Sequence, residues 1–141
     1  MKIFAVGMNY KEHNKELHEP LSKTASPVIF IMPDSALSKD HKPFFIPDDL
    51  GVIEYETEVV VRICRLGKTI SSRFAHRYYD AVTVGIDFTA RELQQQLRAK
   101  GLPWELCKSF DGAATIGDWI DIDKFQDIQR LQFHLDVNGT T

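Results

Sequence analysis

Residues 53–62 read Ile-Glu-Tyr-Glu-Thr-Glu-Val-Val-Val-Arg, and this stretch constrains the fold more than any other part of the chain. A β-strand directs successive side chains to opposite faces, so Glu54, Glu56 and Glu58 are predicted to emerge on one face. At roughly 3.3 Å per residue, the three carboxylates span only about 13 Å. Like charges at this spacing raise one another's pKa unless a positive group lies among them, and a hard divalent cation is a suitable counter-charge.

Two interpretations of the three glutamates stay open at this point. The simpler one is an amphipathic strand whose polar face is solvated, and alternation alone favours it. The continuation of the strand argues against it, because residues 59–61 and Ile63 are apolar on both faces, as in a strand that enters a core. The acids would then lie at the mouth of a buried strand, where uncompensated charge is costly.

Length and composition are typical of one soluble, globular domain. The 141 residues are 43% hydrophobic and 26% charged, and we expect residues 1–141 to form a single catalytic-type domain. A net charge of −3 without a basic cluster argues against a nucleic-acid partner. No apolar run approaches the roughly 18 residues of a membrane span, so no membrane partner and a cytoplasmic location are expected. Cys64 and Cys107 are predicted to be buried thiols.

Three further segments place apolar and β-branched residues between turn-forming residues and are predicted to be strands: 2–6, 27–32 and 81–88. The last of these delivers Asp87 near its C-terminal end. Thr89 and Glu92 fit a capping box, so a helix is predicted to begin after Thr89 and to end at Gly101. Asp87 therefore lies at a strand-to-helix junction, which suits a ligand carboxylate or a turn aspartate that binds local backbone N–H groups.

A histidine–glutamate pair is the other candidate for chemistry. Residues 11–17 are predicted to form a short helix, which places His13 and Glu16 on one face within hydrogen-bonding reach. A carboxylate beside an imidazole orients the ring and raises its basicity, as a general base that activates water requires. A chance pair on an exposed helix is the alternative.

The C-terminal segment has the pattern of a strand followed by a tight turn. Residues 131–137 alternate apolar and polar side chains, and Asn138-Gly139 is a strong two-residue hairpin signal. Only two threonines follow this turn. We therefore expect the chain to be incomplete relative to the fold it encodes, or another chain to supply the partner strand.

Several short motifs, each weak alone, occur in a specific joint order. They are Gly7-Met8-Asn9-Tyr10 with His13 and Glu16, Glu56-Thr57-Glu58, Gly85-Ile86-Asp87-Phe88-Thr89-Ala90-Arg91 with Gln94, Gly101-Leu102-Pro103-Trp104 and Lys108-Ser109-Phe110-Asp111. With these motifs the chain resembles the fumarylacetoacetate hydrolase family, in its small acylpyruvase-like or bacterial 2-hydroxyhepta-2,4-diene-1,7-dioate isomerase-like form. The resemblance implies an α+β fold that is mainly β with a few short helices. It implies a mixed β-sandwich or roll of the family's C-terminal domain type, here without its C-terminal strands.

The resemblance also implies a metal centre. Its ligands would be Glu56, Glu58 and Asp87, which would hold Mg²⁺, Mn²⁺ or Ca²⁺, since carboxylate oxygens suit all three ions. Three carboxylates occupy about half of an octahedral shell, which leaves positions for the 1-carboxylate and 2-oxo oxygens of a small 2-oxo acid. An enolate at C3 of such a substrate is shared by C–C bond hydrolysis, decarboxylation and enol–keto isomerisation.

The remaining site residues implied by the resemblance act on the substrate. Those expected to contact it or its developing negative charge are Arg91, Gln94, Lys108, Asn9 and Tyr10. Those expected to take part in catalysis are Lys108, His13 and Glu16. Lys108 would stabilise charge, and the His13–Glu16 pair would lie on a lid and handle the water or proton. The family also implies a homodimer.

Departures from the family pattern leave two functions open. Met8 and Met32 stand where the family usually has Arg and Lys, so two expected cations are replaced. The first hypothesis is a divalent-metal-dependent enzyme that acts on small 2-oxo acids. The second is a non-catalytic or vestigial family member that serves as a binding or structural subunit. Neither hypothesis assigns a role to Glu54.

Overall fold

The structure is a computed structural model that describes residues 1–10, 28–38 and 42–140. Its smaller sheet pairs β1 (Ile3–Gly7) with β2 (Val28–Met32) in antiparallel orientation, with Ile3 opposite Met32. Alternate residues of both strands turn toward the interior, as the period of a half-buried strand requires. The strands predicted at 2–6 and 27–32 are confirmed.

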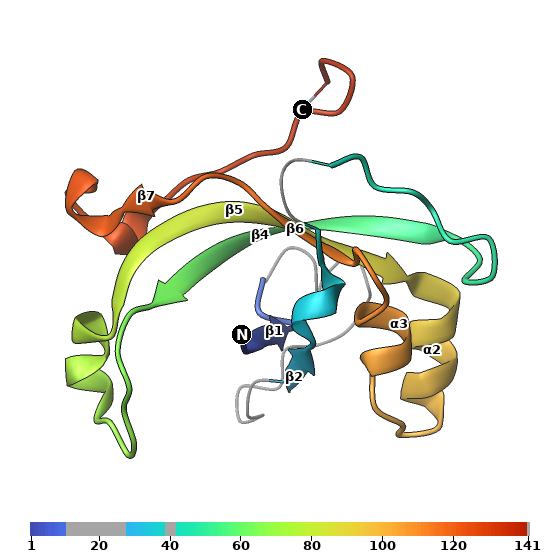
Figure 1. Cartoon of the computed structure of the whole chain (residues 1–141), viewed down its shortest axis with the longest axis horizontal. Helices are drawn as coiled ribbons and strands as arrows, with labels where there is room; N and C mark the ends of the chain where they lie inside the picture. The colour runs from blue at the N-terminus through green and yellow to red at the C-terminus, as the bar shows by residue number, and fades with distance from the viewer. Residues whose placement is uncertain (11–27, 39–41, 141) are drawn as a thin grey trace.

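The larger sheet has five strands in the order β3-β6-β5-β4, with β7 paired to β5 outside this path. The strands are β3 (Leu37–Ser38), β4 (Ile53–Ile63), β5 (Tyr79–Ala90), β6 (Ala114–Ile116) and β7 (Ile120–Asp121). The long strands β4 and β5 run side by side across the molecule (Figure 1). β3 and β6 are parallel and the other pairs are antiparallel, so the sheet is mixed. The predicted mainly β fold with few short helices is confirmed.

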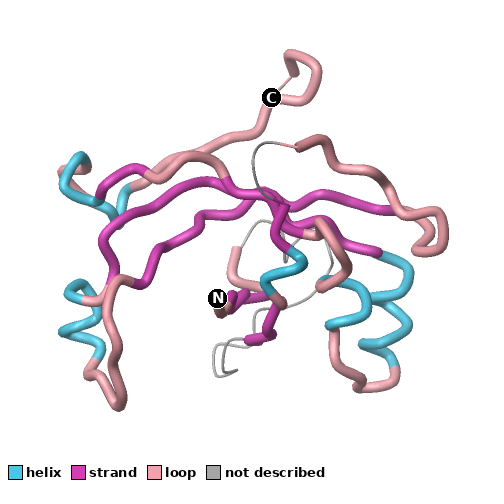
Figure 2. Tube along the Cα trace, in the orientation of Figure 1, coloured by secondary structure: helices cyan, strands magenta, loops and turns pink. Residues whose placement is uncertain are grey.

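Helical segments lie at the two ends of the β4–β5 pair (Figure 2). At one end, α2 (Arg91–Ala99) follows β5 directly, and α3 (Glu105–Lys108) comes next in the chain. At the opposite end, the 3₁₀ segment η2 (Ser72–Arg77) precedes β5. The remaining 3₁₀ segments are η1 (Asp34–Ala36), η3 (Ile122–Lys124) and η4 (Ile128–Arg130).

The capping box predicted for α2 is wrong, whereas the predicted end of the helix is confirmed. β5 continues through Ala90, and Thr89 lies in the strand opposite Glu54. Strand pairing therefore overrides the local capping pattern, and the buried Thr89 hydroxyl has no hydrogen-bond partner among the described residues. Gly101 has φ of +64°, the left-handed conformation expected just after a helix end.

Two small hydrophobic clusters form the core. The first contains Phe30, Met32, Ala36 and Ala113, and the second contains Ala90, Leu97 and Cys107. The rings of Trp104 and Phe110 pack against both clusters. These two aromatic residues thus join the smaller sheet to the α2–α3 end of the larger sheet.

The strand predicted at residues 131–137 is wrong, because most of this segment is loop (Figure 2). The turn at Asn138-Gly139 does form, with φ of +54° and +82°, and Val137 and Thr140 exchange both backbone hydrogen bonds across it. A strand requires a hydrogen-bonded neighbour along its length. Within the described residues, no strand runs beside this segment.

The remaining predictions from composition have mixed outcomes. Cys107 is buried as predicted, but Cys64 is exposed just beyond the end of β4, so the prediction of two buried thiols is wrong for Cys64. None of the helices in the described ranges has the length and apolar character that a membrane span needs.

Candidate functional site

Acidic side chains gather near the α2–α3 end of the β4–β5 pair. Glu56 is paired directly with Asp87 across the two strands, and Glu58 lies opposite Gly85. Directly paired residues project to the same face with Cβ atoms about 5 Å apart, so the register brings Asp87 to the face that carries the glutamates. Gly85 is needed at its position, because a Cβ there would lie 2.6 Å from the backbone oxygen of Thr115 in β6.

Lys108 inserts its ammonium between the paired carboxylates. Its Nζ lies 2.6 Å from Glu56 Oε2 and 2.6 Å from Asp87 Oδ2, and the residue is only 2% exposed. The short helix α3 holds it there, because the Lys108 N–H donates to the carbonyl of Trp104, whose ring packs in the core. A buried ammonium requires such partners, since an unpaired interior charge is costly.

Arg91 binds the other oxygen of Glu56. Its Nη2 lies 2.6 Å from Glu56 Oε1, and its Nε lies 2.6 Å from Glu54 Oε2. Its Nη1 donates to Gln94 Oε1 at 2.6 Å, a contact that the spacing of three on α2 allows. Arg91 and Gln94 are both buried, so Arg91 holds Glu56 in a fixed position. Glu54, which is partly exposed, binds the same guanidinium.

The pKa values of Glu56, Glu58 and Asp87 shift in different directions. Although burial alone would raise the pKa of Glu56, the Lys108 ammonium and the Arg91 guanidinium hold it below its usual range. Burial raises the pKa of Glu58 to about 7, and the charges of Asp87 and Glu56 add to the rise. Burial likewise raises the pKa of Asp87 to about 6, although Lys108 opposes this rise. The two cations thus stabilise the ionised form of Glu56 more than that of its neighbours.

Tyr10 reaches this cluster from the turn that follows β1. Its hydroxyl accepts a hydrogen bond from the Val59 N–H at 3.2 Å and also hydrogen-bonds to Glu58. Burial raises the pKa of the Tyr10 hydroxyl. Tyr10 therefore lies beside a predicted metal ligand, whereas Asn9 is exposed and makes no side-chain hydrogen bond in the described part of the chain.

The structure brings most of the predicted site residues together: Glu56, Glu58, Asp87, Arg91, Gln94, Lys108 and Tyr10. His13 and Glu16 lie outside the described residues, so their catalytic roles stay predictions. Strand alternation places Glu54 on this face, but no pattern in the sequence indicates that it binds Arg91. Nor does the sequence indicate the pairing of Lys108 with Glu56, because no local pattern connects residues 52 positions apart.

The two methionines found in place of basic residues have different environments. Met32 is 3% exposed inside the first core cluster, where its neighbours are apolar. Met8 is half-buried, with φ of +59°, in the turn that leads to Tyr10. Met32 therefore serves packing and supplies no charge to the cluster.

The donor set of the cluster fits a hard divalent cation, although the side chains are arranged around Lys108. As they stand, no three His, Cys, Asp or Glu side chains of the described ranges converge so as to hold an ion. Asp87 Oδ1, however, is buried and lacks a hydrogen-bond partner among these residues. Within the described residues, Arg91 and Lys108 form ion pairs with Glu54, Glu56 and Asp87. These two cations are fewer than the four carboxylates, Glu58 included, and a divalent ion would add the positive charge that such a cluster favours.

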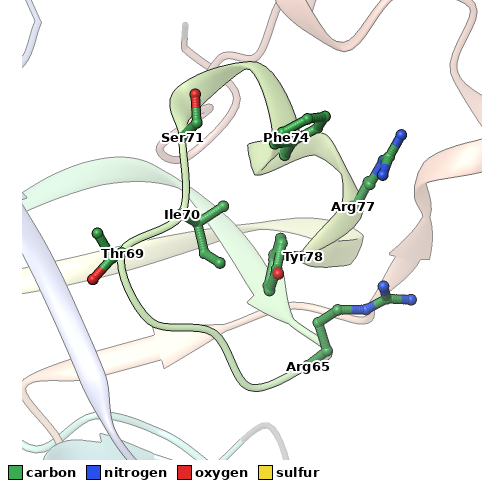
Figure 3. Close-up of a pocket in the computed structure, with 7 residues that line it drawn as sticks. All are labelled: Arg65, Thr69, Ile70, Ser71, Phe74, Arg77 and Tyr78. Carbon is green, nitrogen blue, oxygen red and sulfur yellow. The ribbon is translucent and has the colours of Figure 1, made fainter.

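A depression lies at the opposite end of the β4–β5 pair. It has a volume of about 330 Å³ and is lined by Arg65, Thr69, Ile70, Ser71, Phe74, Arg77 and Tyr78 (Figure 3). The Arg65 guanidinium lies 5.8 Å from the centre of the Tyr78 ring, and that of Arg77 lies 4.9 Å from the centre of the Phe74 ring. Neither guanidinium forms an ion pair with any residue that the structure describes.

Comparison with known proteins identifies the family. The model of the fumarylacetoacetate hydrolase C-terminal family matches residues 2–141. The chain belongs to the fumarylacetoacetate hydrolase family. A solved fumarylacetoacetate hydrolase family protein of Yersinia pestis CO92 agrees, with a TM-score of 0.84 and 38% identity over 91% of this chain and 58% of that chain.

Other members of the fumarylacetoacetate hydrolase family carry names that describe their chemistry. Fumarylpyruvate hydrolase from Pseudomonas aeruginosa, solved in complex with Mn²⁺ and pyruvate, has a TM-score of 0.80 and 30% identity over 88% of this chain and 55% of its own. The mitochondrial oxaloacetate tautomerase FAHD1 of Rattus norvegicus is 31% identical over 137 residues, which are 97% of this chain and 61% of that protein. The chain thus spans about six tenths of the length of the curated relatives that it matches.

Proposed function

We propose that this chain carries the metal site of an enzyme that acts on small 2-oxo acids. The reaction would be C–C bond hydrolysis, decarboxylation or enol–keto isomerisation. The observation that carries the proposal is the buried pairing of Glu56 with Asp87, with Glu58 and Lys108 beside them. The relatives support it, since one is named an oxaloacetate tautomerase and another a fumarylpyruvate hydrolase in complex with Mn²⁺ and pyruvate.

The proposed metal ligands are Glu56, Glu58 and Asp87. The chemistry that a bound divalent cation supplies is polarisation of the 2-oxo group and stabilisation of enolate charge. Lys108 would stabilise negative charge that develops on the substrate, because an oriented cation in a buried site acts more strongly than one in water. Arg91 would keep Glu56 in position through the contacts described above.

The remaining proposed roles concern substrate binding and proton transfer. Tyr10, Asn9 and Gln94, together with Arg91, would contact the substrate, and the half-buried hydroxyl of Tyr10 is suited to orient it. In hydrolysis, His13 would remove a proton from the attacking water, with Glu16 orienting its ring. Decarboxylation needs no attacking water, so the two reactions differ in their dependence on this pair.

Three finer features belong to the same proposal. The proposed ion is Mg²⁺, Mn²⁺ or Ca²⁺, because oxygen ligands suit all three. A homodimer and a cytoplasmic location are proposed from the family resemblance and from composition. Size-exclusion chromatography with light scattering tests the assembly directly.

Metal titration followed by turnover assays tests the proposed function. MgCl₂ or MnCl₂ is expected to raise the melting temperature of the purified chain, because a ligand that binds only the native state stabilises it. Oxaloacetate and a neutral-tailed acylpyruvate form the substrate panel, and Asp87→Asn is expected to abolish turnover. Asp123→Asn, an exposed aspartate in η3, is the matched control. Absence of stabilisation by either ion would contradict the proposal.

A non-catalytic role as a binding or structural subunit is the second candidate. It is favoured by one observation, namely that Lys108 and Arg91 already occupy both oxygens of Glu56, so this ion-pair network holds together without an ion. In that case Glu56→Ala and Asp87→Ala would lower stability, and neither the parent chain nor the variants would turn over any member of the panel.

A further inference from the structure

We propose that the depression at the η2 end of the β4–β5 pair binds a small molecule with at least two anionic oxygen groups, such as a di- or tricarboxylate or a diphosphate. Every residue that lines this depression belongs to residues 64–78, which connect β4 to β5. The carboxylate cluster lies at the other end of the same pair of strands. The inference therefore goes beyond the proposed function and does not depend on the proposed metal site.

The connection between β4 and β5 is positively charged in an acidic chain. Residues 64–78 contain four lysine and arginine residues and no aspartate or glutamate. The remaining 13 of the chain's 17 lysine and arginine residues are outnumbered by 20 acidic residues, so the rest of the chain has a net charge of −7. A concave surface with one sign of charge raises the local concentration of ligands of the opposite sign.

Three arginines of this connection have no oxygen acceptor for their guanidinium groups within the part of the chain that the structure describes: Arg65, Arg73 and Arg77. Arg62 differs, because its Nε donates to Asp80 Oδ1 at 2.7 Å. A guanidinium whose donors are unused can bind a carboxylate or phosphate group through two parallel hydrogen bonds. The connection thus offers several such donors to one anionic ligand.

Aromatic rings bring these arginines together. Arg73 and Arg77 lie 4.6 Å and 4.9 Å from the centre of the Phe74 ring, so their guanidinium carbons are at most 9.5 Å apart, the sum of the two distances. Arg65 lies 5.8 Å from the centre of the Tyr78 ring. A ring face attracts a cation but supplies no oxygen acceptor. The rings therefore favour one position for each guanidinium and leave its N–H groups for a ligand.

The depression has the size and the lining that a small anion requires. Its volume of about 330 Å³ is at the lower end of the range of small-molecule sites, roughly 300–1,000 Å³. Arg65 and Arg77 line it together with Thr69 and Ser71, whose hydroxyl groups form no hydrogen bond to any residue that the structure describes (Figure 3). None of the lining residues is acidic. Two arginines in one depression match a ligand with two anionic groups.

Isothermal titration calorimetry with sodium pyrophosphate and with tricarballylate, at constant ionic strength, measures binding to the full chain. At least one of them is expected to bind at a single site, and the tighter one indicates whether the natural ligand carries phosphate or carboxylate groups. Arg77→Gln should weaken this binding at least about tenfold, because a hydrogen-bonded charge pair is lost. Lys100→Gln, which removes an exposed positive charge just after α2, is the matched control and should bind as the parent does. Binding of neither anion, or parent-like affinity in Arg77→Gln, would overturn the inference.

Two further variants separate a defined site from a general attraction between charges. Arg77→Lys keeps the charge but loses the planar guanidinium, and Phe74→Leu keeps every charge but removes the ring that Arg73 and Arg77 contact. Each is expected to weaken binding by about threefold or more. Arg77 is exposed, so Arg77→Lys should fold even if Phe74→Leu does not. Parent-like affinity in Arg77→Lys would contradict a site that recognises the geometry of the guanidinium.

NMR of the backbone amides locates the bound anion. Signals of residues 64–78 are expected to shift when the anion is added, whereas those of residues 53–58 should not. Shifts confined to residues 53–58 would place the anion at the carboxylate end and overturn the inference. Binding of a hexaglutamate peptide without binding of either small anion would also overturn it, since the surface would then suit an acidic protein partner. Mn²⁺ affinity should be the same in all of these variants, so failure of this inference leaves the proposed function untouched.

Discussion

The two ends of the β4–β5 pair differ in the environment of their positively charged side chains. At the α2–α3 end, Lys108 and Arg91 are buried, and each contacts two carboxylates at 2.6 Å. At the η2 end, Arg65 and Arg77 are exposed over aromatic rings, and residues 64–78 contain no aspartate or glutamate. Water solvates the exposed cations at little cost, whereas the buried cations require carboxylates as partners.

This difference indicates where substitutions will matter. A buried cation that loses its carboxylate keeps the full cost of desolvation, whereas an exposed cation that loses a neighbour is rehydrated. Large effects are therefore expected at the carboxylate end, and small effects at the arginine end. The depression in Figure 3 is a suitable internal reference for the carboxylate cluster, because it is lined by the segment that connects the two strands on which the cluster is built.

The largest effect is expected for Glu56→Gln. This change leaves Lys108 and Arg91 each with one carboxylate partner fewer in a buried site, and removal of one partner of a buried pair costs about 3 kcal/mol or more. Urea denaturation measures the loss in free energy of unfolding. Asp80→Asn, which breaks the exposed pair with Arg62 on the same two strands, is the control and should cause a much smaller loss.

A pH dependence is expected next, because the folded chain raises the pKa of Glu58 to about 7 and that of Asp87 to about 6. A carboxyl group with a raised pKa in the folded state binds more protons there than in the unfolded state, so stability falls as pH rises. In the metal-free chain, this loss should lie between about pH 4 and pH 7, and it should amount to roughly 3 to 6 kcal/mol once solvent screening of the partly exposed Glu58 is allowed for.

Thermal melts at half-unit pH steps, with and without MgCl₂, measure this dependence. Glu58→Gln should flatten the metal-free curve, and the gain from Mg²⁺ should grow as pH rises through the same window. If the stability of the metal-free chain instead increases steadily from pH 5 to pH 7, the folded state does not raise the pKa values of Glu58 and Asp87.

A smaller effect is expected for Glu54→Gln. Glu54 anchors Arg91, but its side chain is 51% exposed, so water screens the pair and the expected loss is about 0.5 kcal/mol. The same change should weaken Mn²⁺ binding slightly, because Arg91 then holds Glu56 less firmly. A loss in stability as large as that of Glu56→Gln would show that the Glu54–Arg91 pair stabilises this end of the sheet as much as Glu56 does.

The smallest effect is expected for Arg77→Gln at the opposite end. Its guanidinium is exposed and lacks a carboxylate partner among the described residues, so the free energy of unfolding should change by less than about 0.5 kcal/mol. Metal affinity should not change. A change in Mn²⁺ affinity on this substitution would show that the two ends of the β4–β5 pair are energetically coupled.

The sequence predicts strands better than it predicts their pairing. Alternation and β-branched content locate β4 and β5, because these patterns are local. Which residue lies opposite Glu56 depends on the register between two strands that are separated by residues 64–78, and no local pattern specifies that register. The pairing of Lys108 with Glu56 depends on the packing of α3 through Trp104, which is tertiary information.

The errors in prediction have the same cause. Thr89 fits a capping box by sequence, but pairing with β4 extends β5 past it and turns its hydroxyl into the interior. Residues 131–137 alternate like a strand, but a strand also requires a neighbour, which local alternation does not provide. In both cases the local sequence preference is overridden, because the structure depends on whether a neighbouring strand is available to pair with.

The register shift between Arg62 and Ile63 has a consequence for engineering. A bulge at that point absorbs a change in residue offset on the η2 side, so the ladder from Ile53 to Arg62 keeps its alignment. Residues 64–78 can then gain or lose length without moving Glu56 away from Asp87. A peptide tag or fluorophore-binding loop grafted into this connection should report on the protein while leaving the carboxylate end unaltered.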